Sequence, residues 1–150
     1  MLSWEGRMKS VRDVLKVKGH AVWSVRPDLT VFDTLKLMAE KEIGAVMVMS
    51  DDRPVGIFTE RDYARQVILK GKASKDTPVQ DVMTSRVVFV RPDQSLDECM
   101  ALMTDKRVRH LPVLENDQLI GVLSIGDVVK AVISEKEFII EQLATYISSG

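Results

Sequence analysis

The 150-residue sequence is poor in cysteine, in aromatic residues and in net charge, and each shortage excludes a class of protein. Its one cysteine, Cys99, can form neither an internal disulfide nor a multi-cysteine zinc site, so nothing indicates an oxidising compartment. Aromatic residues make up 5% of the chain, which disfavours a platform that stacks nucleic-acid bases. With 21 basic and 22 acidic side chains, the chain also lacks the basic excess needed to bind along a phosphate backbone.

Long apolar runs are absent as well. No uninterrupted run approaches the roughly 18 to 20 residues of a transmembrane helix, so we expect no membrane-spanning segment. The first ten residues contain Glu5 and Arg7, where a secretory signal would need apolar residues. Hydrophobic residues nevertheless account for 45% of the chain, enough for one compact domain or two small ones. We therefore expect a cytoplasmic globular protein that binds neither membranes nor nucleic acid.

The chain contains an internal repeat. The string Val-Arg-Pro-Asp at 25–28 recurs at 90–93, and this offset of 65 holds without a gap as far as Ile133. Thirteen of the 44 aligned pairs are identical. Upstream, residues 11–14 match 79–82 at an offset of 68, so the first copy carries three extra residues in a loop. Two copies are too few for a solenoid, and a pseudo-twofold pair of domains is predicted.

The repeat defines the expected domains. We expect a first domain at 11–70, a second at 79–135 and a helical C-terminal extension at 136–150. The small and polar segment 69–78, which contains glycine and proline, is predicted to be a linker.

Hydrophobic periodicity predicts the same order of elements in both copies, namely helix, strand, helix, strand, strand, helix, which is an α/β (α+β) fold. The middle helix of each copy begins with the spacing of a capping box, Thr30 with Asp33 and Ser95 with Glu98. The last helices begin at about Glu60 and Ile125. The predicted strands are 21–25, 45–49 and 55–58 in the first copy and 86–90, 111–114 and 119–123 in the second.

Both copies contain the string glycine, two apolar residues, a hydroxyl residue, two further residues and aspartate, where a strand is expected to lead into a helix. A helix N-terminus offers unpaired amides and the positive end of the helix dipole, which suit a phosphate. The hydroxyl can donate to a phosphate oxygen, and the aspartate can accept two hydrogen bonds from a ribose diol. The string therefore predicts a nucleotide site. The residues are Thr59 and Asp62 in the first copy and Ser124 and Asp127 in the second.

The same spacing is that of an ordinary capping box, so a purely structural role stays open. Basic residues favour ligand binding: Arg61 interrupts the first motif, and Arg107, Arg109 and His110 precede an apolar strand of the second copy. The corresponding residues of the first copy are Glu42, Gly44 and Ala45. The two sites therefore cannot be equivalent.

The doubled order of elements, the two motifs and the string Arg-His-Leu-Pro-Val at 109–113 resemble a tandem pair of cystathionine-beta-synthase (CBS) domains, also called a Bateman module. The resemblance runs from about Val11 to Ile133 and extends to small stand-alone CBS-pair proteins. It implies that an adenosyl ligand, namely AMP, ADP, ATP, NAD(H) or S-adenosylmethionine, binds in clefts between the copies. The basic residues favour a phosphate-bearing ligand over S-adenosylmethionine, which carries a cationic sulfonium.

The resemblance also implies roles for individual residues. Aspartates would bind the ribose hydroxyls, hydroxyl and basic side chains would lie near phosphate, and an apolar slot read by backbone would hold the adenine. The residues concerned are Asp62 and Asp127 for ribose, Thr59, Ser124, Arg109 and His110 for phosphate, and Val22, Thr84 and Val87 for adenine.

The function that we expect is a regulatory module that senses the energy or redox state through its nucleotide and signals to a partner protein. A structural dimerisation adaptor without ligand is the alternative, and a nucleotide-hydrolysing enzyme is a third possibility. The phosphate-binding loop, the dinucleotide fingerprint and the His-Glu-x-x-His string are all missing, so we expect no catalytic residue, metal site or catalytic cofactor.

The C-terminal helix has a wide apolar face that needs a partner surface. This face either packs on the chain's own helices or forms the interface of a homodimer, since symmetric dimers are common. Its residues include Phe138, Ile139, Leu143 and Ile147.

Overall fold

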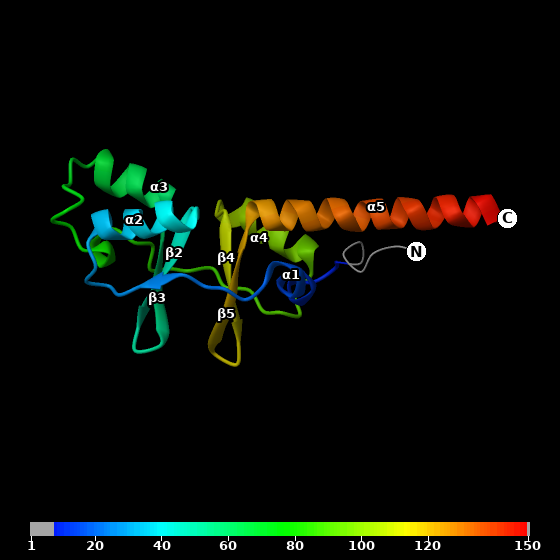
Figure 1. Ribbon diagram of the computed structural model, residues 1–150, viewed down its shortest axis with the longest axis horizontal. Coiled ribbons are helices and arrows are strands. Elements are labelled where there is room, and N and C mark those ends of the chain that lie inside the picture. Colours follow the sequence, from blue (N-terminus) through cyan, green and yellow to red (C-terminus); the bar gives the residue numbers. More distant parts are fainter. Residues whose placement is uncertain (1–7, 150) are drawn as a thin grey trace. The chain divides into compact units, whose positions relative to one another are not determined.

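The computed structural model describes residues 8–149. Residues 1–7, which include the Glu5 and Arg7 that argue against a secretory signal, and Gly150 lie outside the described part. The chain forms two compact units (Figure 1). The first unit is Val22–Val87, and the second unit joins the N-terminal residues up to Ala21 to those from Val88 onward. No described helix is both long enough and apolar enough to span a membrane.

The first unit contains a three-stranded sheet in the order β1-β2-β3. The short strand β1 (Ser24–Val25) runs parallel to β2 (Ala45–Ser50), which pairs antiparallel with β3 (Arg53–Thr59). At the hairpin turn, Asp51 and Asp52 have φ values of 51° and 63°. Positive φ at both central residues is what a type I′ turn requires, and this turn matches the twist of the two strands.

Helices complete the first unit. They are α2 (Val31–Lys41), α3 (Glu60–Asp62), the π-helix η2 (Tyr63–Ile68) that continues α3, and the 3-10 helix η3 (Val79–Asp81). The core brings α2 and the sheet together, with Val31, Val48 and Phe58 fully buried.

The second unit contains the antiparallel hairpin of β4 (His110–Glu115) and β5 (Gln118–Ser124). Around it lie α1 (Val11–Lys18), α4 (Leu96–Lys106) and α5 (Ile125–Ser149). The core of this unit contains residues from every one of these elements: Val11, Leu15, Cys99, Leu111, Leu123 and Val128. The helix α1 is therefore an integral part of the second unit, although in the sequence it belongs to the first copy of the repeat.

The spatial units and the sequence repeat thus divide the chain differently. The expected domains 11–70 and 79–135 follow the repeat, whereas α1 packs with the second copy and residues 79–87 lie with the first. The two exchanged segments dock in the same way. Val11 N and Arg12 N donate to Gln94 O and Pro92 O, and the equivalent Val79 N and Gln80 N donate to Leu29 O and Pro27 O.

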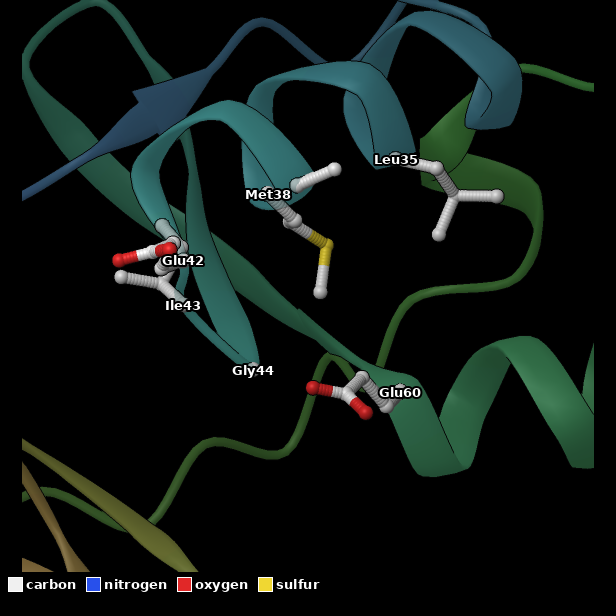
Figure 2. Close-up of a pocket in the computed structure, with 7 residues that line it drawn as sticks. Leu35, Met38, Glu42, Ile43, Gly44 and Glu60 are labelled. Atoms are coloured by element: carbon white, nitrogen blue, oxygen red, sulfur yellow. The ribbon is translucent and has the colours of Figure 1, made fainter.

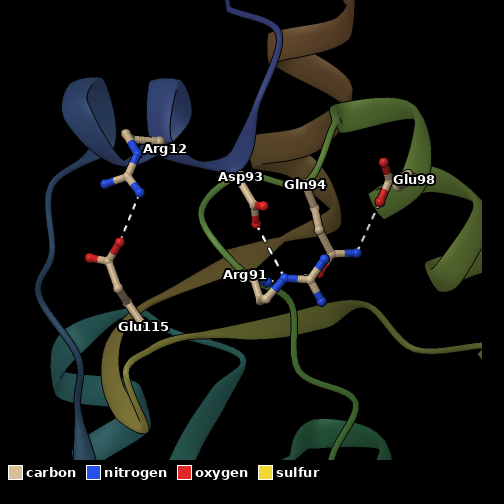
Figure 3. A network of polar contacts seen from close by, with 6 residues as sticks. All are labelled: Arg12, Arg91, Asp93, Gln94, Glu98 and Glu115. Carbon is tan, nitrogen blue, oxygen red and sulfur yellow. Dashed lines mark hydrogen bonds and ion pairs between the residues drawn. The ribbon is translucent and has the colours of Figure 1, made fainter.

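Two glycines make this docking possible. A Cβ atom on Gly121 would lie 2.7 Å from Leu15 Cδ2, and a Cβ atom on Gly56 would collide with Met83 Sδ. Leu15 and Met83 are equivalent at the offset of 68. Each side chain therefore packs directly against the backbone of the last strand of its unit. An ion pair of 2.8 Å between Arg12 and Glu115 adds a contact from α1 to the hairpin (Figure 3).

Three expectations from the sequence are corrected by the structure. Strand 21–25 is reduced to β1, and of 86–90 only Val90 pairs, as an isolated bridge to Val113; the chain passes from the first unit to the second after Val87. The predicted linker 69–78 is part of the first unit, where Thr77 O accepts from Val31 N at 2.8 Å and so caps α2.

The structure confirms the hydroxyl half of both predicted capping boxes. Thr30 and Ser95 accept hydrogen bonds of 3.1 Å from the amides of Asp33 and Glu98. In the second unit the Glu98 carboxylate accepts a hydrogen bond of 3.1 Å from the side-chain amide of Gln94 (Figure 3).

The placement of α1 predicts where a destabilising substitution acts. Leu15 is 1% exposed and Val17, on the same helix, is 47% exposed. We expect Leu15→Ala to lower the free energy of unfolding by about 2–5 kcal/mol in urea denaturation, because it leaves a cavity against Gly121. Val17→Ala is the control and should change it by less than about 1 kcal/mol. Equal effects of the two substitutions would show that α1 is not docked in this way.

Candidate functional site

In the first unit, the motif forms the turn from β3 into α3. Thr59 caps the helix: its Oγ1 accepts from the Asp62 amide at 3.2 Å, and Asp62 Oδ2 accepts from the Thr59 amide at 3.0 Å. The two residues form the capping box that was the alternative interpretation of the motif. This box uses only one carboxylate oxygen of Asp62 for the cap itself.

The other carboxylate oxygen of Asp62 contacts a residue from the exchanged segment. Thr84 Oγ1 donates to Asp62 Oδ1 at 2.9 Å, and the Thr84 backbone pairs with Ile57 through two hydrogen bonds of 2.9 Å. Asp62 is therefore held on one side by the cap and on the other by a neutral hydroxyl. The structure brings together Thr84, Thr59 and Asp62, three of the residues that the sequence singled out.

In the second unit, the motif forms the turn from β5 into α5 with the same cap. Ser124 Oγ accepts from the Asp127 amide at 3.1 Å, and Asp127 Oδ2 accepts from the Ser124 amide at 2.8 Å. The second partner of this carboxylate is a cation: Lys18 Nζ, at the end of α1, donates to Asp127 Oδ2 and also to the carbonyl of Val122. The two aspartates thus have equivalent positions and differently charged neighbours.

These neighbours set the ionisation of Asp127. Partial burial acts to raise the pKa of this carboxyl, but the hydrogen bond from Lys18, the hydrogen bond from the Ser124 amide and the nearby lysine charge outweigh it and hold the pKa below its ordinary value. The carboxylate is therefore ionised at neutral pH.

The basic residues of the second copy lie at the same end of the hairpin. His110 is directly opposite Ser124 in the β4–β5 register, so the two side chains share one face of the hairpin. Arg109 is next to it, and its carbonyl accepts from the Ile125 amide at 2.8 Å, where α5 begins. Arg107 follows α4 in a left-handed conformation with φ 54°. The predicted phosphate residues Ser124, Arg109 and His110 are therefore close together.

The corresponding end of the first unit carries the opposite charge. Glu42 and Gly44, the counterparts of Arg107 and Arg109, line a hollow of about 360 Å³ together with Glu60 (Figure 2). Its apolar wall comes from α2, where Leu35 and Met38 line the hollow. Two carboxylates at this end make the first unit less favourable for a phosphate than the second.

Comparison with known proteins identifies the family of the chain. The family model of the CBS domain matches the chain twice, at residues 10–68 and 79–134. The chain belongs to the CBS domain family. A mitochondrial CBS domain-containing protein of Arabidopsis thaliana, CBSX3, is 39% identical over 151 residues, with 94% of this chain and 73% of the relative covered.

Solved structures of CBS proteins share the fold. A protein with CBS domains from Burkholderia ambifaria is 51% identical, with a TM-score of 0.81 over 84% of this chain and 95% of that one. A CBS domain protein from Pyrobaculum aerophilum complexed with AMP has a TM-score of 0.70 at 22% identity, covering 79% and 88% of the two chains. The tandem CBS pair and the α+β fold expected from the sequence are thereby confirmed.

The remaining predicted site residues lie in the first unit. Val22 and Val87 are half-buried at the two ends of this unit, and Arg61 is half-buried in α3. Whether a cleft joins the two CBS copies stays a prediction. Among residues 8–149, no group of three or more His, Cys, Asp or Glu side chains could hold a metal ion.

Sequence reasoning missed Lys18. The repeat shows that residues 11–14 and 79–82 are equivalent segments, and each was expected to pack with the copy that follows it in the sequence. The alignment says nothing about which copy a segment packs against, so the contact with Asp127 appears only in the fold.

The ion pair predicts a pH dependence of stability. Because the pKa of Asp127 is depressed in the folded protein, its stabilisation is present above the unfolded-state pKa of about 3.9 and is lost as the pH falls through the folded-state pKa. In urea denaturation, the difference in unfolding free energy between wild type and Asp127→Asn should be constant above about pH 5 and shrink below pH 4. Asp105→Asn, at an exposed position of α4, is the control. A difference that is the same at pH 3 and pH 7 would contradict the assignment.

Proposed function

We propose that this CBS pair is a regulatory module that binds an adenosyl nucleotide, of the AMP, ADP, ATP or NAD(H) type, and signals to a partner protein. CBS-domain proteins are regulatory modules, and one solved CBS protein of the same fold is an AMP complex. The observation that carries the proposal is the placement of Ser124, Asp127 and His110 at the start of α5, which combines a carboxylate for ribose with donors for phosphate.

Charge supports a phosphate-bearing ligand in the second unit. Arg109 and His110 lie at the start of α5 and Arg107 ends α4 two residues before Arg109, whereas Glu42 and Glu60 line the hollow of the first unit. A phosphate is attracted to the first set and repelled by the second. We therefore assign the higher affinity for nucleotides to the site at Asp127, and a second, weaker site to Asp62.

Regulation requires that the nucleotide bind one arrangement of the protein better than another. The difference in nucleotide-binding free energy between the two arrangements sets how far the ligand can shift the protein toward the arrangement that a partner protein recognises. The regulated partner, the energy- or redox-sensing role and a cytoplasmic location are parts of the proposal, together with the absence of catalysis.

Removing each aspartate tests the sites separately. We expect Asp127→Ala to abolish the tighter phase of nucleotide binding in isothermal titration calorimetry, and Asp62→Ala to remove a weaker phase. Each substitution removes acceptors for ribose hydroxyls, and a lost charged hydrogen bond reduces affinity by about tenfold or more. The matched controls are Asp105→Ala and Asp76→Ala, at exposed positions of the second and first unit. Wild-type affinity in both motif variants would refute the assignment.

Thermal unfolding and a turnover assay on the wild-type protein distinguish the alternative functions. A ligand that binds the native state raises the thermal midpoint of unfolding, so an unmoved midpoint with AMP, ATP, NAD and S-adenosylmethionine would favour a structural adaptor. A hydrolase would convert bound nucleotide in stoichiometric excess over protein, whereas a binding module returns it unchanged. Mass spectrometry of co-purifying small molecules identifies the nucleotide.

We also propose a homodimer, with α5 as part of its interface. Val128 and Ala131 face the core of the second unit, whereas residues further along α5 are exposed. The exposed apolar residues beyond residue 136 are Ile139, Ile140, Leu143, Tyr146 and Ile147. Such a face is typical of a helix with an unoccupied partner surface.

A charge in this face tests the dimer. In sedimentation velocity we expect wild type to sediment as a dimer and Leu143→Glu to sediment as a monomer, because a carboxylate would be buried without a partner. Glu141→Gln, an exposed position two residues away, is the control and should stay dimeric. A monomeric wild type at micromolar concentration would refute the proposal.

A further inference from the structure

Lys18 reaches the aspartate of the second motif from α1, which lies outside the second copy of the repeat. Its ammonium donates to Asp127 Oδ2 and to the Val122 carbonyl. The side chains of Lys18 and Asp127 are 35% and 26% exposed, so both charges are partly shielded from water and open to a ligand. An ion pair in such a place has a stronger effect on a neighbouring charge than one that is fully solvated.

The group at the same place in the first unit is a hydroxyl from the segment after η3. Asp62 Oδ1 accepts from Thr84 Oγ1 instead, a neutral group. Both docked segments reach the aspartate of their unit, η3 (three residues) through Thr84 just after it and α1 (eight residues) through its last residue, Lys18.

We propose that Lys18 determines the charge specificity of the site at Asp127, so that this site selects adenosyl ligands with phosphate groups over the neutral nucleoside. This inference rests on the proposed function.

The hydrogen bonds show how a ribose and Lys18 can share one carboxylate. Both the Ser124 amide and Lys18 donate to the same oxygen of Asp127, Oδ2. The oxygen Oδ1 is therefore the acceptor for a ribose hydroxyl. Lys18 stays in place and neutralises the carboxylate, which would otherwise repel a phosphate held by Ser124 and His110.

A charge effect has a signature that a structural effect lacks, because it grows with the charge of the ligand. The test uses the full chain with Asp62→Ala as background, so that calorimetry reports the Asp127 site, and titrates adenosine, AMP and ATP. We expect Lys18→Met, which keeps the aliphatic stem, to weaken AMP about tenfold and ATP more, and to change adenosine by less than threefold. Lys18→Arg should retain most of the affinity for AMP.

The control is Lys70→Met, which removes the same charge at an exposed position of the first unit and should change none of the affinities by more than twofold. Thermal unfolding of each variant shows that it is folded at the titration temperature. An equal loss for all three ligands would show that Lys18 acts only through the structure. A gain in affinity for AMP and ATP would show that Lys18 competes with the ligand for Asp127, and either result overturns the inference.

The test separates this inference from the proposed function. If wild type and the Asp62→Ala background bind none of the three ligands, the nucleotide-binding function falls and the role of Lys18 falls with it. If they bind AMP and ATP and Lys18→Met binds all three as tightly as its background, only the role of Lys18 is refuted.

Discussion

The docking of a side chain against a strand glycine is the contact on which the arrangement of both candidate sites depends. Leu15 lies on Gly121 and Met83 lies on Gly56, at distances that leave no room for a Cβ atom. These contacts dock the first segment of each copy onto the other copy's unit and place Lys18 and Thr84 beside the aspartates of the motifs. Glycine leaves room for the ends of the Leu15 and Met83 side chains directly on the strand backbone, and burial of Leu15 makes its contact favourable.

The two docked segments make the pair of sites asymmetric. The hydroxyl of Thr84 leaves the charge of Asp62 in place, and the ammonium of Lys18 balances that of Asp127. The strand ends add to this difference, because His110 faces Ser124 in one unit and Ala45 faces Thr59 in the other. The protein therefore keeps one backbone arrangement in both copies and varies the charge of its side chains, which gives the two proposed sites different surroundings.

The capping box and the ligand site use the same residues. In both units the hydroxyl and the aspartate satisfy free amides at a helix start, as the capping-box interpretation of the spacing predicted. The cap orients the carboxylate without exhausting it, since Asp127 retains Oδ1. The cap at Asp127 is thus compatible with the binding role that we propose for this residue.

Local signals in the sequence determined much of this structure. The repeat, the two hairpins, the helix starts after Thr59 and Ser124, and the caps at Thr30 and Ser95 follow from periodicity, turn residues and cap spacing, which are properties of neighbouring residues. Only the tertiary structure decided that α1 packs on the second copy, that 69–78 caps α2, and that Lys18 meets Asp127 at a separation of 109 residues. Contacts between distant segments depend on which apolar surfaces bury each other, and a pattern along the chain leaves that choice open because both copies offer an equivalent glycine.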